Sequence, residues 1–186
     1  FDIPLISNIP NIVYLAPTSK EEYLAMLQWG LDQQEQPVVV RTPSAEVVST
    51  GEKIEPDFSK LNTYKKVAQG NKVAIIGLGA FFKLGQEVKK HLKETTGIDA
   101  TLINPRFITG LDENMLNSLV EDHEVVITLE DGLLNGGFGE KIARFYGDKD
   151  VKVLNFGATK EFTDSVPVEE LYTRYHLTKE LIVDDI

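Results

Sequence analysis

The acidic and glycine residues between positions 130 and 139 are the first group in this chain that could do chemistry. Glu130 and Asp131 follow an apolar run that predicts a parallel strand, and glycines occupy positions 136, 137 and 139. Ligands of α/β proteins collect at the carboxyl ends of such strands. Backbone N–H groups in a glycine turn that opens a helix can hold an anion. The alternative, which we favour, is a tight turn for close packing, with Glu130 and Asp131 as surface or interface carboxylates.

Two arginines near predicted strands could recognise a phosphate. Arg41 ends the run PVVVR, and Arg106 closely follows the strand predicted at 100–103. A guanidinium can donate two parallel N–H bonds to a phosphate, which makes each arginine a candidate substrate contact. Each can equally be a structural ion-pair partner, and the sequence leaves both interpretations open.

Other potentially reactive residues lack the companions that chemistry requires. His91, His123 and His176 show no metal-ligand spacing, and no Ser-His-Asp arrangement can be assigned. The segment 77–79, Gly-Leu-Gly, joins a predicted strand to a predicted helix. Phe82 stands where a dinucleotide-binding fingerprint needs its third glycine, so we predict only a strand-to-helix turn there.

Composition excludes several classes of function. The chain has 186 residues, a net charge of −10 and 42% hydrophobic residues, which is ordinary for a globular protein. The negative charge argues against nucleic-acid binding, which needs an excess of Lys and Arg. The absence of cysteine excludes disulfides, thiolate metal sites and cysteine nucleophiles, and is compatible with a reducing cytosol. No apolar run approaches the roughly 20 residues of a membrane span.

The elements that would position these residues alternate between strands and helices. Strands are expected at residues 11–16, 37–41, 65–68, 72–76, 100–103, 124–129 and 151–156. Helices are expected on apolar spacings that begin near residues 19, 81, 112, 139, 168 and 178. This alternation predicts the α/β class, with a parallel sheet covered by helices on both faces and an edge strand at 65–68.

Local signals set the ends of several of these helices. Residues 19–22 have the spacing of a capping box, after which Leu24, Leu27 and Leu31 give a helical period. Asp112 is expected to cap a later helix. Residues 50–61 are read as a linker, because Ser, Glu and Pro replace core residues around them.

The order of motifs along the chain resembles the transketolase superfamily, and most closely its 1-deoxy-D-xylulose-5-phosphate synthase family. The matching segments are Phe1-Asp2, Ile9-Pro10-Asn11, Ala16-Pro17-Thr18, Met26-Leu27, Pro37 to Pro43, Asn104-Pro105-Arg106-Phe107, Leu111-Asp112-Glu113, His123-Glu124, Glu130-Asp131, Gly136 to Gly139 and Asn155-Phe156-Gly157. The resemblance covers nearly the whole chain and rests on the shared order of individually weak motifs.

The resemblance implies a domain organisation. Residues 1–49 would be the C-terminal part of a pyrimidine-binding domain, 50–61 a linker, and 62–186 a transketolase C-terminal domain. The family's thiamine diphosphate and Mg²⁺ motifs would precede Phe1. We therefore expect no catalytic, cofactor-binding or metal-binding residue in this chain, and take Arg41 as its candidate substrate-binding residue.

The resemblance also implies a function for the parent protein. It would be a cytoplasmic, homodimeric transferase of isoprenoid biosynthesis that uses thiamine diphosphate and Mg²⁺. It would join a unit from pyruvate to glyceraldehyde 3-phosphate with loss of carbon dioxide, with no nucleic-acid or membrane partner. The present piece alone is expected to be inactive and to bind no cofactor.

The chain departs from the family pattern where the acceptor's phosphate would bind. Ser44 replaces the usual Arg after Pro43, Ala45 replaces a Gly, and 109–110 reads Thr-Gly where Lys-Pro is common. Loss of a charge-assisted contact would weaken phosphate recognition by about 2 kcal/mol. The alternative function is a non-catalytic interaction module, or a beta subunit of a split transketolase or 2-oxoacid dehydrogenase.

Overall fold

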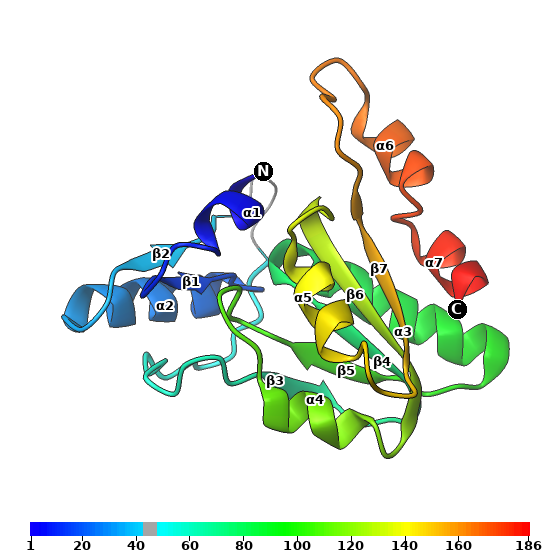
Figure 1. Cartoon of the computed structure of the whole chain (residues 1–186), viewed down its shortest axis with the longest axis horizontal. Helices are drawn as coiled ribbons and strands as arrows, with labels where there is room; N and C mark the ends of the chain where they lie inside the picture. Colours follow the sequence, from blue (N-terminus) through cyan, green and yellow to red (C-terminus); the bar gives the residue numbers. More distant parts are fainter. Residues whose placement is uncertain (43–47) are drawn as a thin grey trace.

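The computed structural model describes residues 1–42 and 48–186, which form two sheets with helices packed around them (Figure 1). Ser44 and Ala45, where the chain departs from the family pattern, lie outside the described residues. The first sheet pairs β1 (Val13–Leu15) with β2 (Val38–Val40) in parallel. Parallel strands need a crossover, which α2 (Lys20–Asp32) supplies. A short helix that we did not expect, α1 (Asp2–Ile6), precedes them.

The second sheet has five strands in the order β3-β5-β4-β6-β7. Their bounds are β3 (Lys65–Ala68), β4 (Lys72–Gly77), β5 (Thr101–Asn104), β6 (His123–Leu133) and β7 (Lys152–Ala158). All neighbouring strands are parallel except β3, which pairs antiparallel with β5 at the edge. The predicted α/β class and the edge strand at 65–68 are therefore confirmed.

Helices cover both faces of this sheet. They are η1 (Gly79–Phe81), α3 (Phe82–Thr96), α4 (Glu113–Leu119), α5 (Phe138–Phe145) and α7 (Lys179–Asp185). A further helix, α6 (Val168–Arg174), has no buried residue and lies beyond the sheet (Figure 1). Successive residues of β4 alternate between the faces: Ala74 and Ile76 join one core cluster, Val73 and Ile75 the other. The apolar run of β4 thus serves two cores, as expected for a parallel strand buried on both faces.

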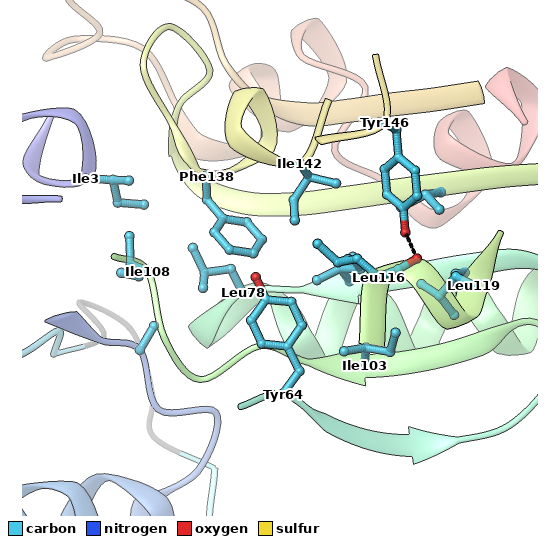
Figure 2. Packing of buried hydrophobic residues seen from close by; sticks show 14 of the residues in the cluster. Ile3, Tyr64, Leu78, Ile103, Ile108, Leu116, Leu119, Phe138, Ile142 and Tyr146 are labelled. Atoms are coloured by element: carbon cyan, nitrogen blue, oxygen red, sulfur yellow. Dashed lines mark hydrogen bonds between the residues drawn. The ribbon is translucent and has the colours of Figure 1, made fainter. Parts of the chain in front are cut away.

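Figure 2 shows the cluster on the face covered by α4 and α5. Leu116 from α4 and Phe138 and Ile142 from α5 are fully buried there. Tyr146 is buried with them, and its hydroxyl donates to the Leu116 carbonyl at 2.8 Å. On the opposite face, α3 and α7 pack together, with Val88, Leu92 and Ile182 buried.

A third cluster packs the two-stranded sheet and α2 against Phe58 and Phe107, which lie outside both sheets. Trp29 of α2 packs edge-on against Phe58, which in turn packs against Phe107. Phe58 is buried although it falls within the predicted linker, so this segment contributes to a core. The free edge of β1 also bonds to the backbone at 106–108: the Ala16 N–H donates to the Arg106 carbonyl, and the Ile108 N–H to the Tyr14 carbonyl.

The predicted helix caps at Ser19 and Asp112 are confirmed, but the reciprocal half of the capping box differs, because the Glu22 carboxylate accepts the Thr18 N–H, one residue before the Ser19 cap. The Ser19 and Asp112 side chains accept N–H bonds from Glu22 and Met115, respectively. Gly97 ends α3 with φ 77°, a conformation that favours glycine. The strand-to-helix turn at 77–79 also needs a glycine, because a Cβ on Gly77 would lie 2.8 Å from the Phe82 Cα.

Three sequence-based expectations need correction. Leu24 and Leu31 are 53% and 83% exposed, and the buried face of α2 instead includes Met26 and Trp29. The predicted helix is present, but it has two rows of apolar residues. The row with the leucines faces outward, and the other row is buried. The strand expected to be buried at 37–41 is only half-buried in β2, which lies in a two-stranded sheet.

The third correction concerns β6, which continues to Leu133 instead of ending at 129. Glu130 and Asp131 therefore lie within the strand. The pairing of β6 with β7 shifts its register between Leu129 and Leu133. Beyond this shift, Leu133 pairs with Ala158. None of the helices in the described part of the chain is long and apolar enough to cross a membrane.

Candidate functional site

A cleft of about 1010 Å³ opens at the carboxyl ends of strands from both sheets. Its lining includes a residue that follows each of four strands: Thr18 after β1, Arg41 after β2, Ala80 after β4 and Thr159 after β7. Asp131 lines it near the end of β6. This is the edge where α/β proteins place ligands, so the topology makes the cleft the candidate site.

One wall of the cleft is apolar and comes from α6. Val168, Leu171 and Tyr172 of this helix line the cleft, and α6 has no fully buried residue. The Tyr172 ring meets the Phe81 ring edge-on, with centroids 6.2 Å apart. The cleft therefore combines an apolar wall with polar groups at the strand ends.

Arg41 connects the two sides of the cleft. Its Nε donates to the Asp2 carboxylate at 2.7 Å, and its Nη2 donates to the backbone carbonyl of Asp131 at 2.5 Å. Nη1 lies 3.5 Å from the Asp131 carboxylate. The Arg41 side chain is 17% exposed. These partners match the structural ion-pair interpretation, and a phosphate would have to share the guanidinium with two carboxylates.

Asp2 is held in its charged form. Partial burial acts to raise the pKa of Asp2, but hydrogen bonds from Arg41 and Tyr14 outweigh burial and lower this pKa to about 2. The Tyr14 hydroxyl donates to the Asp2 Oδ2 atom at 2.5 Å. The carboxylate thus ties α1 to β1 and to the end of β2.

Replacing Arg41 by Gln is expected to raise the pKa of Asp2 from about 2 toward the ordinary value of 3.8. The Gln amide keeps a donor but removes the positive charge, while the burial that raises the pKa remains. NMR titration of the Asp2 carboxyl carbon measures this change. Lys90→Gln on the outer surface of α3 is the control, and an unmoved Asp2 pKa in Arg41→Gln would contradict the assignment.

Glu130 occupies the helix N-terminus that we considered for an external anion. Its side chain is fully buried, and its two carboxylate oxygens accept the backbone N–H groups of Phe138 (2.9 Å) and Gly139 (2.8 Å) at the start of α5. The group at this helix N-terminus is therefore a carboxyl group of the chain itself. The expectation that Glu130 is a surface or interface carboxylate was wrong, whereas the Asp131 side chain is 43% exposed.

Burial raises the pKa of Glu130 to about 7, even though the N–H bonds from Gly139 and Phe138 and the charge of Arg41 lower it. The neighbouring carboxylate of Glu140 adds to the increase. Glu130 therefore titrates near neutral pH.

The glycine turn is explained by the space this carboxylate needs. A Cβ on Gly137 would lie 2.5 Å from a Glu130 oxygen and 2.4 Å from the Leu133 carbonyl. A Cβ on Gly139 would lie 2.6 Å from the Thr128 hydroxyl. The predicted tight turn with close packing is confirmed. The sequence predicted the glycine turn, but it did not predict that the turn packs around the Glu130 carboxyl group.

Arg106 is not among the residues that line the cleft. Its Nη2 donates to the Thr63 carbonyl at 2.8 Å, and its guanidinium lies 5.8 Å from the centroid of the Phe58 ring. Within the described part of the chain, its buried Nε has no hydrogen-bond partner. The structure therefore separates the two candidate arginines: Arg41 faces the cleft, and Arg106 packs against the segment before β3.

Glu22 is a buried acid whose role sequence reasoning missed. Its carboxylate accepts the Thr18 N–H (2.8 Å), the Thr18 hydroxyl (2.9 Å) and the Asn104 amide (3.1 Å). These bonds connect the start of α2 to the end of β5. The capping-box spacing marked Glu22 as a helix residue, but nothing in the local pattern indicated its partner 82 positions away.

His123 has the contacts of a structural residue. It is buried, with Nε2 2.8 Å from the Thr101 hydroxyl and Nδ1 3.0 Å from the Leu119 carbonyl. His176 is exposed and pairs with Asp185. Nowhere in residues 1–42 or 48–186 do three His, Cys, Asp or Glu side chains gather as a metal site would require.

The cleft does not suit thiamine diphosphate with Mg²⁺, the cofactor that the family resemblance implies. Among the described residues that line it, six acidic side chains stand against three basic ones: Asp2, Glu87, Glu130, Asp131, Glu161 and Glu180 against Arg41, Lys83 and Lys179. Such a lining repels a diphosphate. We therefore assign no cofactor to these residues, and the expectation that the cofactor binds elsewhere in the parent protein stays a prediction.

Known proteins resemble the chain in sequence along its full length. It is 34% identical to the 1-deoxy-D-xylulose-5-phosphate synthase of Clostridium tetani and 35% identical to that of Alkaliphilus oremlandii. Each alignment covers 100% of this chain and 30% of the relative. The chain therefore spans about a third of the length of these curated relatives.

Solved structures show the same fold. One described as "Split gene transketolase, inactive beta4 tetramer" matches with a TM-score of 0.78 at 24% identity, over 98% of this chain and 59% of that one. The transketolase mutant R525L of Pichia stipitis matches with a TM-score of 0.66 at 14% identity, over 96% of this chain and 25% of that one. The family model for the C-terminal domain of transketolase matches residues 62–182. The chain thus belongs to the transketolase C-terminal domain family.

Proposed function

We propose that this chain is the C-terminal part of a thiamine-diphosphate-dependent transferase of the 1-deoxy-D-xylulose-5-phosphate synthase kind. The observation that carries the proposal is the 34% identity to the Clostridium tetani synthase along the entire chain. The alignment includes the first 61 residues, which lie before the matched C-terminal domain. We accordingly assign 1–49 to the end of a pyrimidine-binding domain, 50–61 to a linker and 62–186 to the C-terminal domain.

In this proposal the chain forms one side of the substrate path and does not perform the chemistry. Thiamine diphosphate and Mg²⁺, held by other parts of the protein, supply the carbanion stabilisation that decarboxylation of pyruvate needs. Arg41 is the proposed substrate contact, because its guanidinium reaches the cleft and is oriented there by Asp2 and Asp131. The competing carboxylates would make this contact weaker than that of a free arginine.

A second candidate function is that of a subunit which acts only with a partner chain. It is favoured by the TM-score of 0.78 over 98% of the chain to a structure described as an inactive tetramer of beta subunits from a split-gene transketolase. On this alternative the chain contributes assembly surfaces and the wall of the cleft, and a separate polypeptide carries the cofactor.

The test is carbon dioxide release from pyruvate by the complete natural polypeptide that carries this chain, with thiamine diphosphate and Mg²⁺. We expect release that depends on glyceraldehyde 3-phosphate, with deoxyxylulose 5-phosphate as product. Arg41→Ala is expected to raise the KM for the acceptor at least about tenfold, as loss of a charge-assisted hydrogen bond does. Release that is indifferent to this acceptor, or no release, would contradict the synthase assignment.

A further inference from the structure

The segment that joins β7 to α7 forms a wall of the cleft but contains no buried residue. It comprises residues 159–175 and includes α6. Val168 and Tyr172, which line the cleft, are 54% and 39% exposed. Figure 1 shows this segment in orange, beyond the end of the five-stranded sheet. We call residues 159–175 the flap.

The polar side chains of the flap bond to one another. The Arg174 guanidinium donates to Glu161 at 3.2 Å and to Glu170 at 2.7 Å, and the Tyr175 hydroxyl donates to Glu161 at 2.5 Å. Within residues 1–42 and 48–186, no side-chain hydrogen bond or ion pair joins the flap to the rest of the molecule. The loop before α6 is therefore tied to α6, and the two can move together.

Aromatic contacts hold the flap against the sides of the cleft. The Tyr172 ring meets the Phe81 ring edge-on at 6.2 Å, and the Phe162 ring lies 6.0 Å from the Phe1 ring. Phe162 nevertheless stays 87% exposed, so the second contact covers little of it. Tyr175, at the end of the flap, packs beside the core. A single edge-to-face pair shifts an equilibrium only about tenfold, which leaves the flap weakly held.

Both ends of the flap are fixed to the body of the domain. At the first end, the Ala158 carbonyl accepts the Leu134 N–H at 3.0 Å. Beyond the second end, Leu177 is buried, and so is Ile182 of α7. The chain reverses between the flap and α7 at His176, whose φ of 55° is uncommon for a residue other than glycine. Ala158 and His176 are therefore the positions at which the flap can turn.

We propose that the flap is a lid over the cleft, which opens by turning at Ala158 and His176 and thereby separates Tyr172 from Phe81. The apolar residues of α6 form the wall of the cleft when the lid is closed and leave it when the lid opens. A seven-residue helix is unstable by itself in water, so α6 loses its protection from solvent in the open state. The inference rests on the proposed function only for the identity of the molecule that enters the cleft.

Hydrogen exchange measured by mass spectrometry on the complete natural polypeptide tests the opening. Helices α6 and α7 both have seven residues, but only α7 has a buried residue, Ile182. After correction for intrinsic rates, the amides of α6 are expected to exchange at least about tenfold faster than those of α7. Equal protection of the two helices would overturn the lid and leave the synthase assignment intact. Because exchange needs no turnover, a failed activity assay leaves the lid intact.

Substitution of Tyr172 tests the contact that holds the lid. Tyr172→Ala is expected to speed exchange in α6 about tenfold more and to leave α7 unchanged, because it removes the ring that meets Phe81. Tyr172→Phe keeps the ring and is the matched control, which should exchange as the native chain does. Unchanged exchange in Tyr172→Ala, or an equal increase in α7, would reject the proposal.

Access to the cleft has a separate readout. Leu84 of α3 is half-buried and lines the cleft, and the chain has no cysteine, so Leu84→Cys places a single thiol of this chain there. Its alkylation by N-ethylmaleimide, followed by mass spectrometry of the peptide, is expected to be several-fold faster in combination with Tyr172→Ala. Lys90→Cys, on the outer surface of α3, is the control and should react at one rate in both backgrounds. A Leu84→Cys rate that does not respond to Tyr172→Ala would show that the flap does not control access.

Discussion

Gly137→Ala is expected to lower the free energy of unfolding by about 3 kcal/mol, which is in the range of severe overpacking. The added Cβ would lie 2.4 Å from the Leu133 carbonyl, which is backbone of β6, and 2.5 Å from a Glu130 oxygen, which cannot retreat without breaking the cap on α5. Gly137 has φ −76°, a value open to any residue, so the cost comes from the clash and not from backbone strain. Urea unfolding monitored by circular dichroism measures the loss.

Gly97→Ala provides the matched comparison. Gly97 has φ 77°, and a Cβ there would have no atom within 4 Å, so this substitution tests strain without a clash. Its expected cost is about 1 kcal/mol. If Gly137→Ala cost no more than Gly97→Ala, the close packing of the turn around Glu130 would not be the reason for its glycines.

Glu130→Gln is expected to remove a pH dependence of stability that the native chain shows between about 4.5 and 7. The pKa of Glu130 is raised in the folded state to about 7, above its ordinary value of 4.5. The folded protein therefore binds more protons in this window than the unfolded chain does, so stability falls as the pH rises. At full burial the effect amounts to about 3 kcal/mol.

The difference in unfolding free energy between the native chain and Glu130→Gln isolates this group, because other titrating residues cancel. Relative to the variant, the native chain should lose stability as the pH rises from 4.5 through 7, and the difference should level off above that. Asp131→Asn, at the half-exposed neighbouring position, is the control. A flat difference, or one with the opposite slope, would show that burial does not destabilise the Glu130 carboxylate.

The core strands of this fold could be predicted from the sequence because each of them is a short, continuous apolar run. Val73 to Ile76 could be identified as a buried strand without knowing which residues face which helix. The same reasoning chose the wrong face of α2. Its leucines and the set Ala25, Met26 and Trp29 both have a helical spacing, and the sequence alone does not show which set packs against the rest of the fold. Helix α1 was missed because five residues containing a proline carry too little period to identify a helix.

The candidate site was less predictable than the fold. The glycines, Glu130 and Arg41 were all noticed from the sequence, yet their roles depend on partners far along the chain. Arg41 bonds to Asp2 and Asp131, 39 and 90 positions away. The burial of Glu130 follows from the path of β6 and from the glycines around it, and no local pattern separates a buried cap from a surface carboxylate.

The backbone bonds between β1 and residues 106–108 affect how the chain should lose its structure. With Phe107 and Phe58 in the same core as Trp29, the first 42 residues share their interior with segments far beyond position 50. Separating the two-stranded sheet from residues 106–108 would expose this shared core and leave the backbone groups of 106–108 without partners. We therefore expect residues 1–42 and the C-terminal domain to unfold in one cooperative transition. The proposed linker then joins two stretches of sequence that are not independent units of stability.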